Sequence, residues 1–188
     1  MNRLRLIIVA GCVAVASGQS AQAVDSVGTI AATLTLTNGC LINGSPSQSG
    51  INFGTLNFGT QPATFSTLTT QLTGASGGNS FAIQCTTTSY TVQVTSNNNA
   101  TTPGTTIGTP GTPARYLMNA ANTTGVAYSI YTDSAFQNVI ANNAPIAATS
   151  TTGGVSNYTL YGRIQGGGNS VSVAPGVYTD TINVSVTY

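Results

Sequence analysis

Short runs in which apolar and polar residues alternate recur along the whole sequence. The clearest is the last, in which single polar residues separate Ile182, Val184, Val186 and Tyr188. A period of two places successive side chains on opposite faces of a β-strand, so each such run predicts a half-buried strand. The same pattern occurs at residues 30–37, 81–86, 90–95, 126–130 and 158–164.

The segments between these runs have the chemistry of turns. Residues 74–79, 96–99 and 166–169 are rich in Gly, Asn and Ser, which tolerate positive φ. Residues 97–113 contain so much Thr, Pro and Gly that we expect a loop without regular structure. The best helical candidate is one short turn after Asp133, with the aspartate as N-cap. Many short strands separated by such turns predict an all-β, antiparallel sandwich.

The first residues have the pattern of a secretory signal. Arg3 and Arg5 precede an apolar run too short to span a bilayer, and Ala21-Gln22-Ala23 has the small-residue spacing of a cleavage site. We therefore expect residues 1–23 to be a signal peptide. The alternative is a lipobox ending in Cys12, although the apolar run continues beyond that cysteine.

Few residues of the chain carry a charge. Charged residues make up 4% of the chain, against roughly 25% in typical domains. Without the signal peptide, two arginines and three aspartates leave a net charge of −1. Nucleic-acid binding requires clustered Lys and Arg, so we expect no nucleic-acid partner.

The residue inventory also argues against an enzyme. The sequence has no His, Lys or Glu, which removes catalytic triads, Schiff-base lysines and His-bearing metal sites. A carboxylate pair would have to come from Asp133 and Asp180, which we interpret as turn and cap residues. Arg163 is interpreted as a solvent-facing strand charge rather than a ligand contact. We expect no catalytic residue, no cofactor and no metal.

Cys40 and Cys85 remain after the signal peptide. In an exported chain such a pair predicts a disulfide, since free thiols or metal ligation find no further His or Cys to support them. The bond would close a 45-residue loop. The chain-entropy treatment gives roughly 4 kcal/mol for a loop of this size.

Both ends of the exported chain carry a strand pattern without protection. Natural sheets guard their edges with Lys, Pro, bulges or inward charges, and the run from Ile182 has none of these. One interpretation is that this run and residues 26–37 are ordinary strands paired within one monomer. The other is strand exchange, in which residues 26–37 of one copy complete the sheet of the next.

Several motifs, in order, resemble the spore-coat-protein-U-like family, the subunits of archaic (Csu-type) chaperone–usher pili. They extend over nearly the whole exported chain. The matching stretches are "NGC" (38–40), "FGTLNFG" (53–59), "FAIQC" (81–85), "VAYSIYTD" (126–133), "YGRI" (161–164) and "PGVYTDTINVSVTY" (175–188).

The resemblance implies an incomplete immunoglobulin-like domain over residues 38–188, preceded by an N-terminal donor strand at residues 24–37. The residues that it implies for the donor strand are Ile30, Ala32, Leu34 and Leu36. Those implied for the acceptor and chaperone-binding edge are Ile182, Val184, Val186 and Tyr188. The implied partners are a periplasmic chaperone, an outer-membrane usher, further copies of the chain and related subunits.

The function that follows is a subunit of a surface pilus or coat-like fibre of a Gram-negative bacterium. Its role would be adhesion or biofilm formation. The alternative is a self-contained secreted sandwich that binds a carbohydrate or surface ligand, with Tyr116, Tyr128 or Tyr161 as its platform.

Overall fold

The structure is a computed structural model that describes residues 25–166, 168–169 and 174–188. The chain divides into two units, residues 1–35 and residues 36–188, and each is described by itself. In the first unit neither helix nor strand is assigned to residues 25–35. The signal peptide predicted for residues 1–23 lies outside the described residues. Nowhere in the described residues is there a helix with the length and apolar character of a membrane span.

The second unit is built from strands, with no helix among its described residues. Two four-stranded antiparallel sheets have the orders β1-β5-β12-β11 and β10-β13-β4-β2. The first contains β1 (Cys40–Ile42), β5 (Phe81–Cys85), β12 (Val155–Tyr158) and β11 (Ser150–Thr152). The second contains β10 (Ser129–Tyr131), β13 (Tyr161–Ile164), β4 (Leu68–Thr73) and β2 (Thr55–Leu56).

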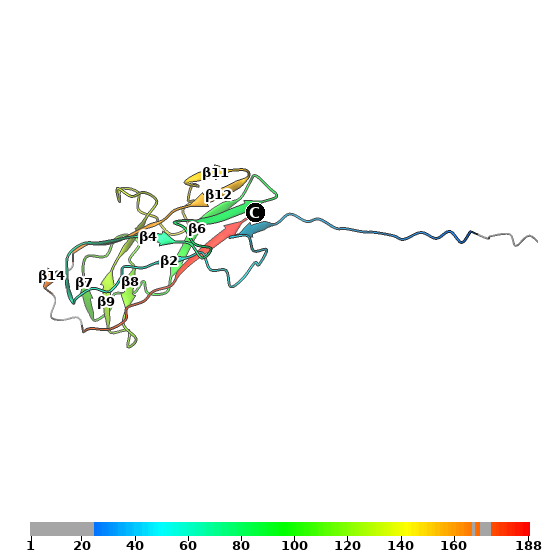
Figure 1. Cartoon of the computed structure of the whole chain (residues 1–188). Helices are drawn as coiled ribbons and strands as arrows, with labels where there is room; N and C mark the ends of the chain where they lie inside the picture. The colour runs from blue at the N-terminus through cyan, green and yellow to red at the C-terminus, as the bar shows by residue number, and fades with distance from the viewer. Residues whose placement is uncertain (1–24, 167, 170–173) are drawn as a thin grey trace, which may run out of the picture. The chain divides into compact units, whose positions relative to one another are not determined.

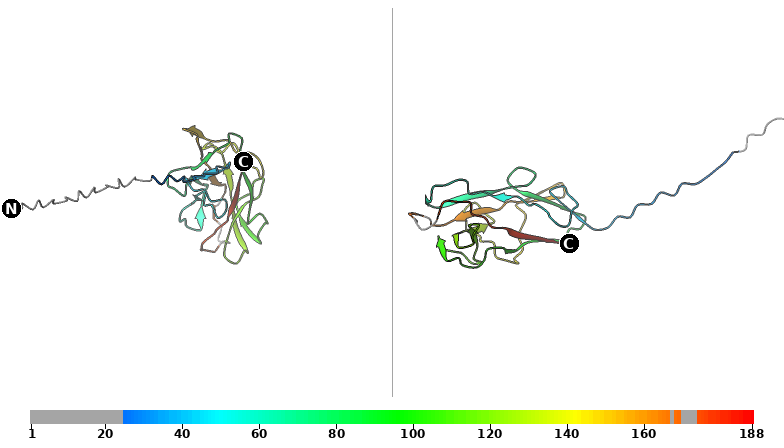
Figure 2. Two further views of the ribbon diagram at one scale, coloured as in Figure 1. Left: turned by 90° about the vertical axis from the view of Figure 1, so that its right-hand side faces the viewer. Right: turned by 90° about the horizontal axis from the view of Figure 1, so that it is seen from below.

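Three smaller sheets complete the unit. The last strand, β15 (Ile182–Thr187), pairs antiparallel with β6 (Thr91–Asn97), and the two lie side by side in Figures 1 and 2. β7 (Thr105–Ile107) and β8 (Tyr116–Met118) flank β9 (Thr124–Ala127), to which β7 is parallel. β14 (Gly168–Asn169) pairs with β3 (Thr64–Phe65).

The larger of two buried apolar clusters in the second unit forms its main core. Alternate residues of β5 and β6 point into it, so Phe81, Ile83, Val92 and Val94 are buried while their neighbours are more exposed. The ring of Phe81 stacks on Tyr158 of β12, with 5.1 Å between the ring centroids. Buried aromatic and β-branched side chains of this kind supply most of the folding free energy of a sandwich.

The predicted all-β fold is confirmed, and β5, β6 and β15 coincide with three of the predicted alternating runs. The run at 126–130 divides into β9 and β10 at Tyr128, and the run at 158–164 spans the end of β12 and all of β13. No strand is assigned at residues 30–37. The turn after Asp133 is not a helix, although the Asp133 carboxylate does accept hydrogen bonds from the amides of Gln137 and Asn138.

The prediction that residues 97–113 lack regular structure is wrong, because β7 lies within them. Ile107 is the reason. Its side chain is buried in the core, and the strand gains a parallel partner in β9. A single buried side chain with one partner strand leaves no periodic signal in the sequence.

Candidate functional site

The last strand has a partner along one edge. Its partner β6 is covered on the far side by residues 143–146, where the amides of Asn143 and Ile146 donate to the Val94 and Val92 carbonyls at 2.7 and 2.8 Å. β15 therefore ends this sheet, and in the described part of the chain no strand pairs with its other edge. A bare edge offers a row of backbone donors and acceptors to another chain.

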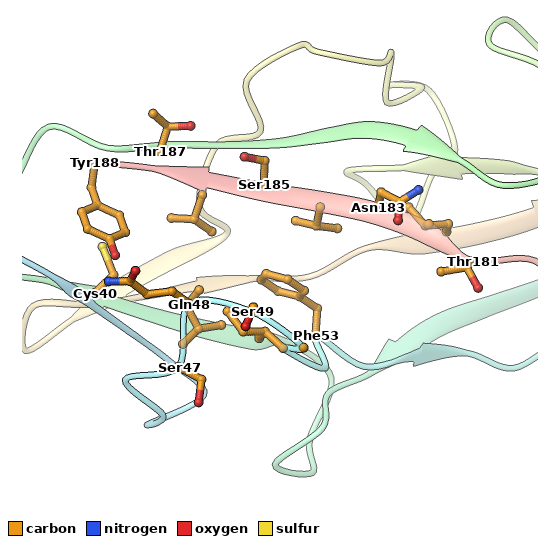
Figure 3. Close-up of a pocket in the computed structure, with 16 residues that line it drawn as sticks. Cys40, Ser47, Gln48, Ser49, Phe53, Thr181, Asn183, Ser185, Thr187 and Tyr188 are labelled. Carbon is orange, nitrogen blue, oxygen red and sulfur yellow. The ribbon is translucent and has the colours of Figure 1, made fainter.

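A groove runs along that open edge. It consists of two adjoining hollows of about 610 and 330 Å³. They share five lining residues, so they form one continuous depression: Ile51, Phe53, Thr181, Ile182 and Val184. One side is β15, and the opposite side is the segment between β1 and β2. Figure 3 shows Phe53 and Gln48 facing the strand across the gap.

The larger hollow follows β15 as far as Tyr188 and has a polar outer wall. Ser47, Gln48 and Ser49 line it, together with the end of β1 at Cys40. Figure 3 shows Cys40 near Tyr188 at one end of the groove and Thr181 at the other. At the Tyr188 end of the groove, the first strand of the unit, β1, therefore approaches the last, β15.

The smaller hollow lies at the beginning of β15 and is largely apolar. Its walls include side chains of the buried core or packed against it: Phe58, Leu72, Phe81, Leu117 and Leu160. Its titratable members are Tyr128 and Asp180. An apolar recess beside unpaired backbone is suited to binding an extended segment with apolar side chains.

Two Asn-Phe-Gly triplets build the wall opposite β15. In each, the asparagine Oδ1 accepts a hydrogen bond from the glycine amide two residues later, at 2.9 Å for Asn52 and 2.8 Å for Asn57. Such Asx turns fix a tight bend. They direct Phe53 and Phe58 toward the core, where Phe53 makes an edge-to-face contact with Phe81 at 5.0 Å.

Two glycines allow close approaches in this wall, Gly54 to the backbone of β4 and Gly162 to the Phe58 ring. Gly54 has φ of 133°, and a Cβ there would lie 2.4 Å from the Thr73 carbonyl oxygen. Gly162 of β13 lies under the Phe58 ring, where a Cβ would come within 2.8 Å of Cζ. Gly54 of "FGTLNFG" and Gly162 of "YGRI" therefore have a packing role in the groove wall.

Asp180 holds the beginning of β15 in place. Its Oδ2 accepts hydrogen bonds from the Tyr128 hydroxyl at 2.8 Å and from Asn97 Nδ2 at 2.9 Å. Its Oδ1 accepts from the amides of Asn99 at 3.0 Å and Thr181 at 2.8 Å. Four donors satisfy this carboxylate, so its role is structural, as the sequence analysis expected for a cap residue.

Burial shifts the pKa values of two titratable groups near Asp180, namely Tyr128 and Arg115. Burial raises the pKa of Tyr128, and the neighbouring Asp180 charge and hydrogen bond raise it further. Burial lowers the pKa of Arg115, an effect that nearby Tyr128 and Asp180 partly offset. The Arg115 side chain is 0% exposed and donates to Asn142 Oδ1 at 2.7 Å. Nothing in the sequence pattern predicted a buried arginine.

The disulfide predicted between Cys40 and Cys85 is present. The two residues are direct partners in the antiparallel β1–β5 pair. The bond fixes β1, which has three residues, at the polar end of the groove.

The structure brings the predicted C-terminal residues together in one groove. Ile182, Val184 and Val186 are half-buried, pack against the core and line the larger hollow with Tyr188. The predicted donor residues are exposed, with exposed fractions of 98% for Ile30, 81% for Leu34 and 82% for Leu36, and Ala32 is exposed as well. Sequence reasoning missed the wall at residues 47–58, for which the repeated Asn-Phe-Gly triplet was the available signal.

The tyrosine platform of the alternative hypothesis is contradicted for Tyr116 and Tyr128. Tyr116 and Tyr128 are buried, so neither presents a ring face to a ligand. Tyr161 is half-buried, and Gln71 Nε2 lies 3.4 Å from its hydroxyl. Arg163 lies over the Phe136 ring, with 5.5 Å from Cζ to the ring centroid. Among the described residues no group of three His, Cys, Asp or Glu side chains is placed to hold a metal ion.

The fold and the groove define a class of protein: an all-β domain that presents an apolar, unpaired strand edge. Residues 26–185 match the Spore Coat Protein U domain family, and the chain belongs to this family. The family resemblance drawn from the sequence is thereby confirmed. This family consists of structural subunits and not of enzymes.

Among solved structures, the chain is similar to the crystal structure of the CsuC–CsuE chaperone–tip adhesion subunit pre-assembly complex. That complex comes from the archaic chaperone–usher Csu pili of Acinetobacter baumannii. The identity is 19%, the TM-score is 0.44, and the match covers 82% of this chain and 41% of the other. The match thus extends over about two fifths of the length of that chain. No curated protein matches the sequence.

Proposed function

We propose that this protein is a structural subunit of a surface pilus or fimbria that polymerises by strand donation between copies. The observation that carries the proposal is the apolar groove along the unpaired edge of β15. Residues 26–37 of another copy are the proposed occupant, because they combine a strand pattern with exposed, regularly spaced apolar side chains.

The physical gain from occupation has two parts. The donated segment supplies hydrogen-bond partners for the open edge of β15, as in other β-augmentation complexes. It also removes Ile30, Leu34 and Leu36 from water, which contributes roughly 1.5–3 kcal/mol for each side chain before the cost of ordering the segment.

An exposed edge and groove also need protection before assembly. We propose that a periplasmic chaperone first lends a strand to β15, and that an outer-membrane usher then replaces it with the N-terminal segment of the next subunit. In the resembled family the chaperone strand is parallel to the last strand and the donor strand is antiparallel. Parallel pairing is slightly less stable per residue, which favours the exchange in the forward direction.

The assembled fibre would lie on the surface of a Gram-negative bacterium and support adhesion or biofilm formation. The Cys40–Cys85 disulfide suits this location, because an extracellular domain keeps its disulfides. The hypothesis of a self-contained carbohydrate-binding sandwich loses support, since Tyr116 and Tyr128 of its platform are buried.

The experiment that tests the proposal compares two aspartate substitutions in neighbouring residues of the donor segment. Leu34→Asp places a charge on the face that would enter the groove, whereas Thr35→Asp places it on the opposite face. We expect wild type and Thr35→Asp to give multimer ladders on unheated SDS gels that collapse to monomer on boiling. Leu34→Asp and deletion of residues 24–37 should abolish the ladder and leave chaperone binding intact.

Two results would contradict the proposal. The first is a normal ladder from the deletion variant, which would show that residues 24–37 are not the donor. The second is a stable monomer that purifies without a chaperone and binds glycans saturably, which would favour the self-contained sandwich.

A further inference from the structure

For a donor strand antiparallel to β15, as in the proposed function, we infer its register in the groove of a second copy: Leu36 lies opposite Ile182 and Leu34 opposite Val184. The same register places Ala32 opposite Val186 and Ile30 opposite Tyr188. This inference rests on the proposed function, and it adds which donor side chain meets which part of the groove.

The alternation of apolar and polar residues in both segments limits the possible registers. Ile182, Val184 and Val186 of β15 pack against the core. Of the alternate residues, Asn183 and Thr187 are exposed and Ser185 is half-buried. From Ile30 onward the donor segment has its large apolar residues at even positions and Thr at 33, 35 and 37. A one-residue slip would turn every threonine into the groove, so the registers compatible with an apolar groove differ by steps of two residues.

The polarity of the groove lining changes along its length. Ile182 and Val184 border both hollows, including the apolar one lined by Phe58 and Leu160. Val186 and Tyr188 border the larger hollow alone, where Ser47, Gln48 and Ser49 form the wall. The apolar end of the acceptor is therefore at the beginning of β15.

The donor segment has a matching gradient. Its leucines, Leu34 and Leu36, lie at its C-terminal end, while Gly28 and Ala32 make its N-terminal half smaller and less apolar. The antiparallel register places both leucines beside the apolar hollow. The parallel register of the same phase would place them opposite Val186 and Tyr188 beside the serine-rich wall, and would leave the apolar hollow to Ile30 and Ala32.

The antiparallel registers slipped by two residues fit less well. One slip moves Leu36 beyond Ile182 to the position opposite Asp180, whose carboxylate has four donors and is not an apolar partner. The other slip moves Leu34 beside the serine-rich wall and leaves no donor side chain opposite Ile182. Among the three antiparallel registers, the proposed one pairs all four donor residues with the four acceptor residues of β15 and Tyr188.

Cysteine pairs on the exposed face of the two strands test the register directly. Thr35→Cys with Asn183→Cys marks the proposed pairing, and Thr35→Cys with Thr187→Cys marks the parallel one. Thr33→Cys with Asn183→Cys and Thr35→Cys with Ser185→Cys mark the two slips. Directly opposed residues meet the Cα separation of a disulfide, whereas diagonal neighbours about 7–8 Å apart do not.

Each double variant is expressed in the full chain with its chaperone and usher, and the fibres are run on boiled, non-reducing SDS gels. We expect the T35C/N183C variant to retain a covalent ladder that collapses with reductant. The other three pairs should give at least about tenfold less covalent multimer, since their Cα atoms lie beyond disulfide reach. Single-cysteine variants control for exchange with Cys40 and Cys85.

Unheated gels of the same fibres distinguish a wrong register from a failure of strand donation itself. A heat-sensitive ladder with covalent linkage at T35C/T187C or at a slipped pair overturns the register and leaves strand donation intact. Absence of any ladder from wild-type protein overturns the proposed function and the register with it. Because Asn183 Nδ2 donates to Ser96 Oγ at 3.0 Å, Asn183→Cys alone must form a normal unheated ladder for its pairs to count. If it does not, Ala31→Cys with Thr187→Cys marks the same register and decides.

Discussion

At the scale of single residues, the Asp180 carboxylate fixes the point where β15 begins. Replacing it by alanine removes four hydrogen bonds and leaves Tyr128 and Asn97 without their acceptor in a buried setting. Hydrogen bonds to charged groups contribute about 1.5–3 kcal/mol each, so loss of the two from the buried donors Tyr128 and Asn97 alone should lower the free energy of unfolding of Asp180→Ala by at least about 3 kcal/mol. Urea denaturation of the purified chain measures it.

Asp25 supplies the control for this measurement. It is exposed, so Asp25→Ala should change the free energy of unfolding by less than about 0.5 kcal/mol. Equal effects of the two substitutions would show that Asp180 does not hold the strand in place.

The pKa of Asp133 gives a prediction with a defined sign. Hydrogen bonds from the backbone amides of Asn138 and Gln137 lower this pKa below its ordinary value of 3.8. A carboxyl group with a lowered pKa stabilises the fold above its ordinary pKa and loses that contribution as the pH falls through the lowered value. Asp133→Asn should therefore be less stable than wild type near neutral pH. The difference should diminish as the pH falls below 3.8 and disappear once the pH has passed through the lowered pKa.

Urea midpoints of both proteins at several pH values test this pH dependence. A difference that stayed constant down to the lowest pH would mean that the charge of Asp133 makes no contribution.

At the scale of elements, β1 depends on its covalent link to β5. β1 has three residues and stands at the end of its sheet, and Cys40 lines the groove. We expect the double variant Cys40→Ala/Cys85→Ala to lose roughly 4 kcal/mol of stability, because the unfolded chain is no longer restricted by the closed loop. Urea denaturation in parallel with the reduced wild-type chain separates loss of the link from loss of the sulfur atoms.

The groove adds a second consequence of removing this disulfide. If β1 leaves its place, the polar end of the groove loses a wall, and the multimer ladder on unheated SDS gels should shorten as well. A variant with reduced stability and an unchanged ladder would show that β1 contributes to folding alone.

The elements that could be predicted from sequence are those with a complete alternating run. β5, β6 and β15 have such runs because one face of each strand meets the core and the other does not. β7 escaped prediction because Ile107 alone anchors it, and its partner β9 is distant in sequence. The Asx turns of the two Asn-Phe-Gly triplets also escaped, since side-chain hydrogen bonds to the backbone leave no period.

At the scale of the whole molecule, one of the two walls of the groove, the one formed by β15, could be predicted from the sequence. The residues of β15 form one contiguous run, so their common face could be assigned before the structure. The opposite wall is a loop. Its side chains Phe53 and Phe58 are held in place by contacts with Phe81 and Tyr128, which are distant in the sequence. Arg115 was equally out of reach, because its burial depends on the packing around it rather than on its neighbours in sequence.

Because the chain carries so few charges, we predict that fibre stability depends little on NaCl concentration. Charged residues are 4% of the chain, and the groove has Asp180 as its charged lining residue among those described. Strand donation would then depend on apolar burial and backbone hydrogen bonds, which salt screens little compared with exposed charge pairs. We expect fibre heat resistance and the rate of subunit exchange to change less than about twofold between roughly 0.05 and 0.5 M NaCl, whereas sulfate should strengthen the fibres. SDS gels of fibres heated to increasing temperatures measure the heat resistance, and exchange with labelled subunits measures the exchange rate. A tenfold loss in NaCl would place ion pairs between subunits, and the apolar groove would no longer account for the assembly.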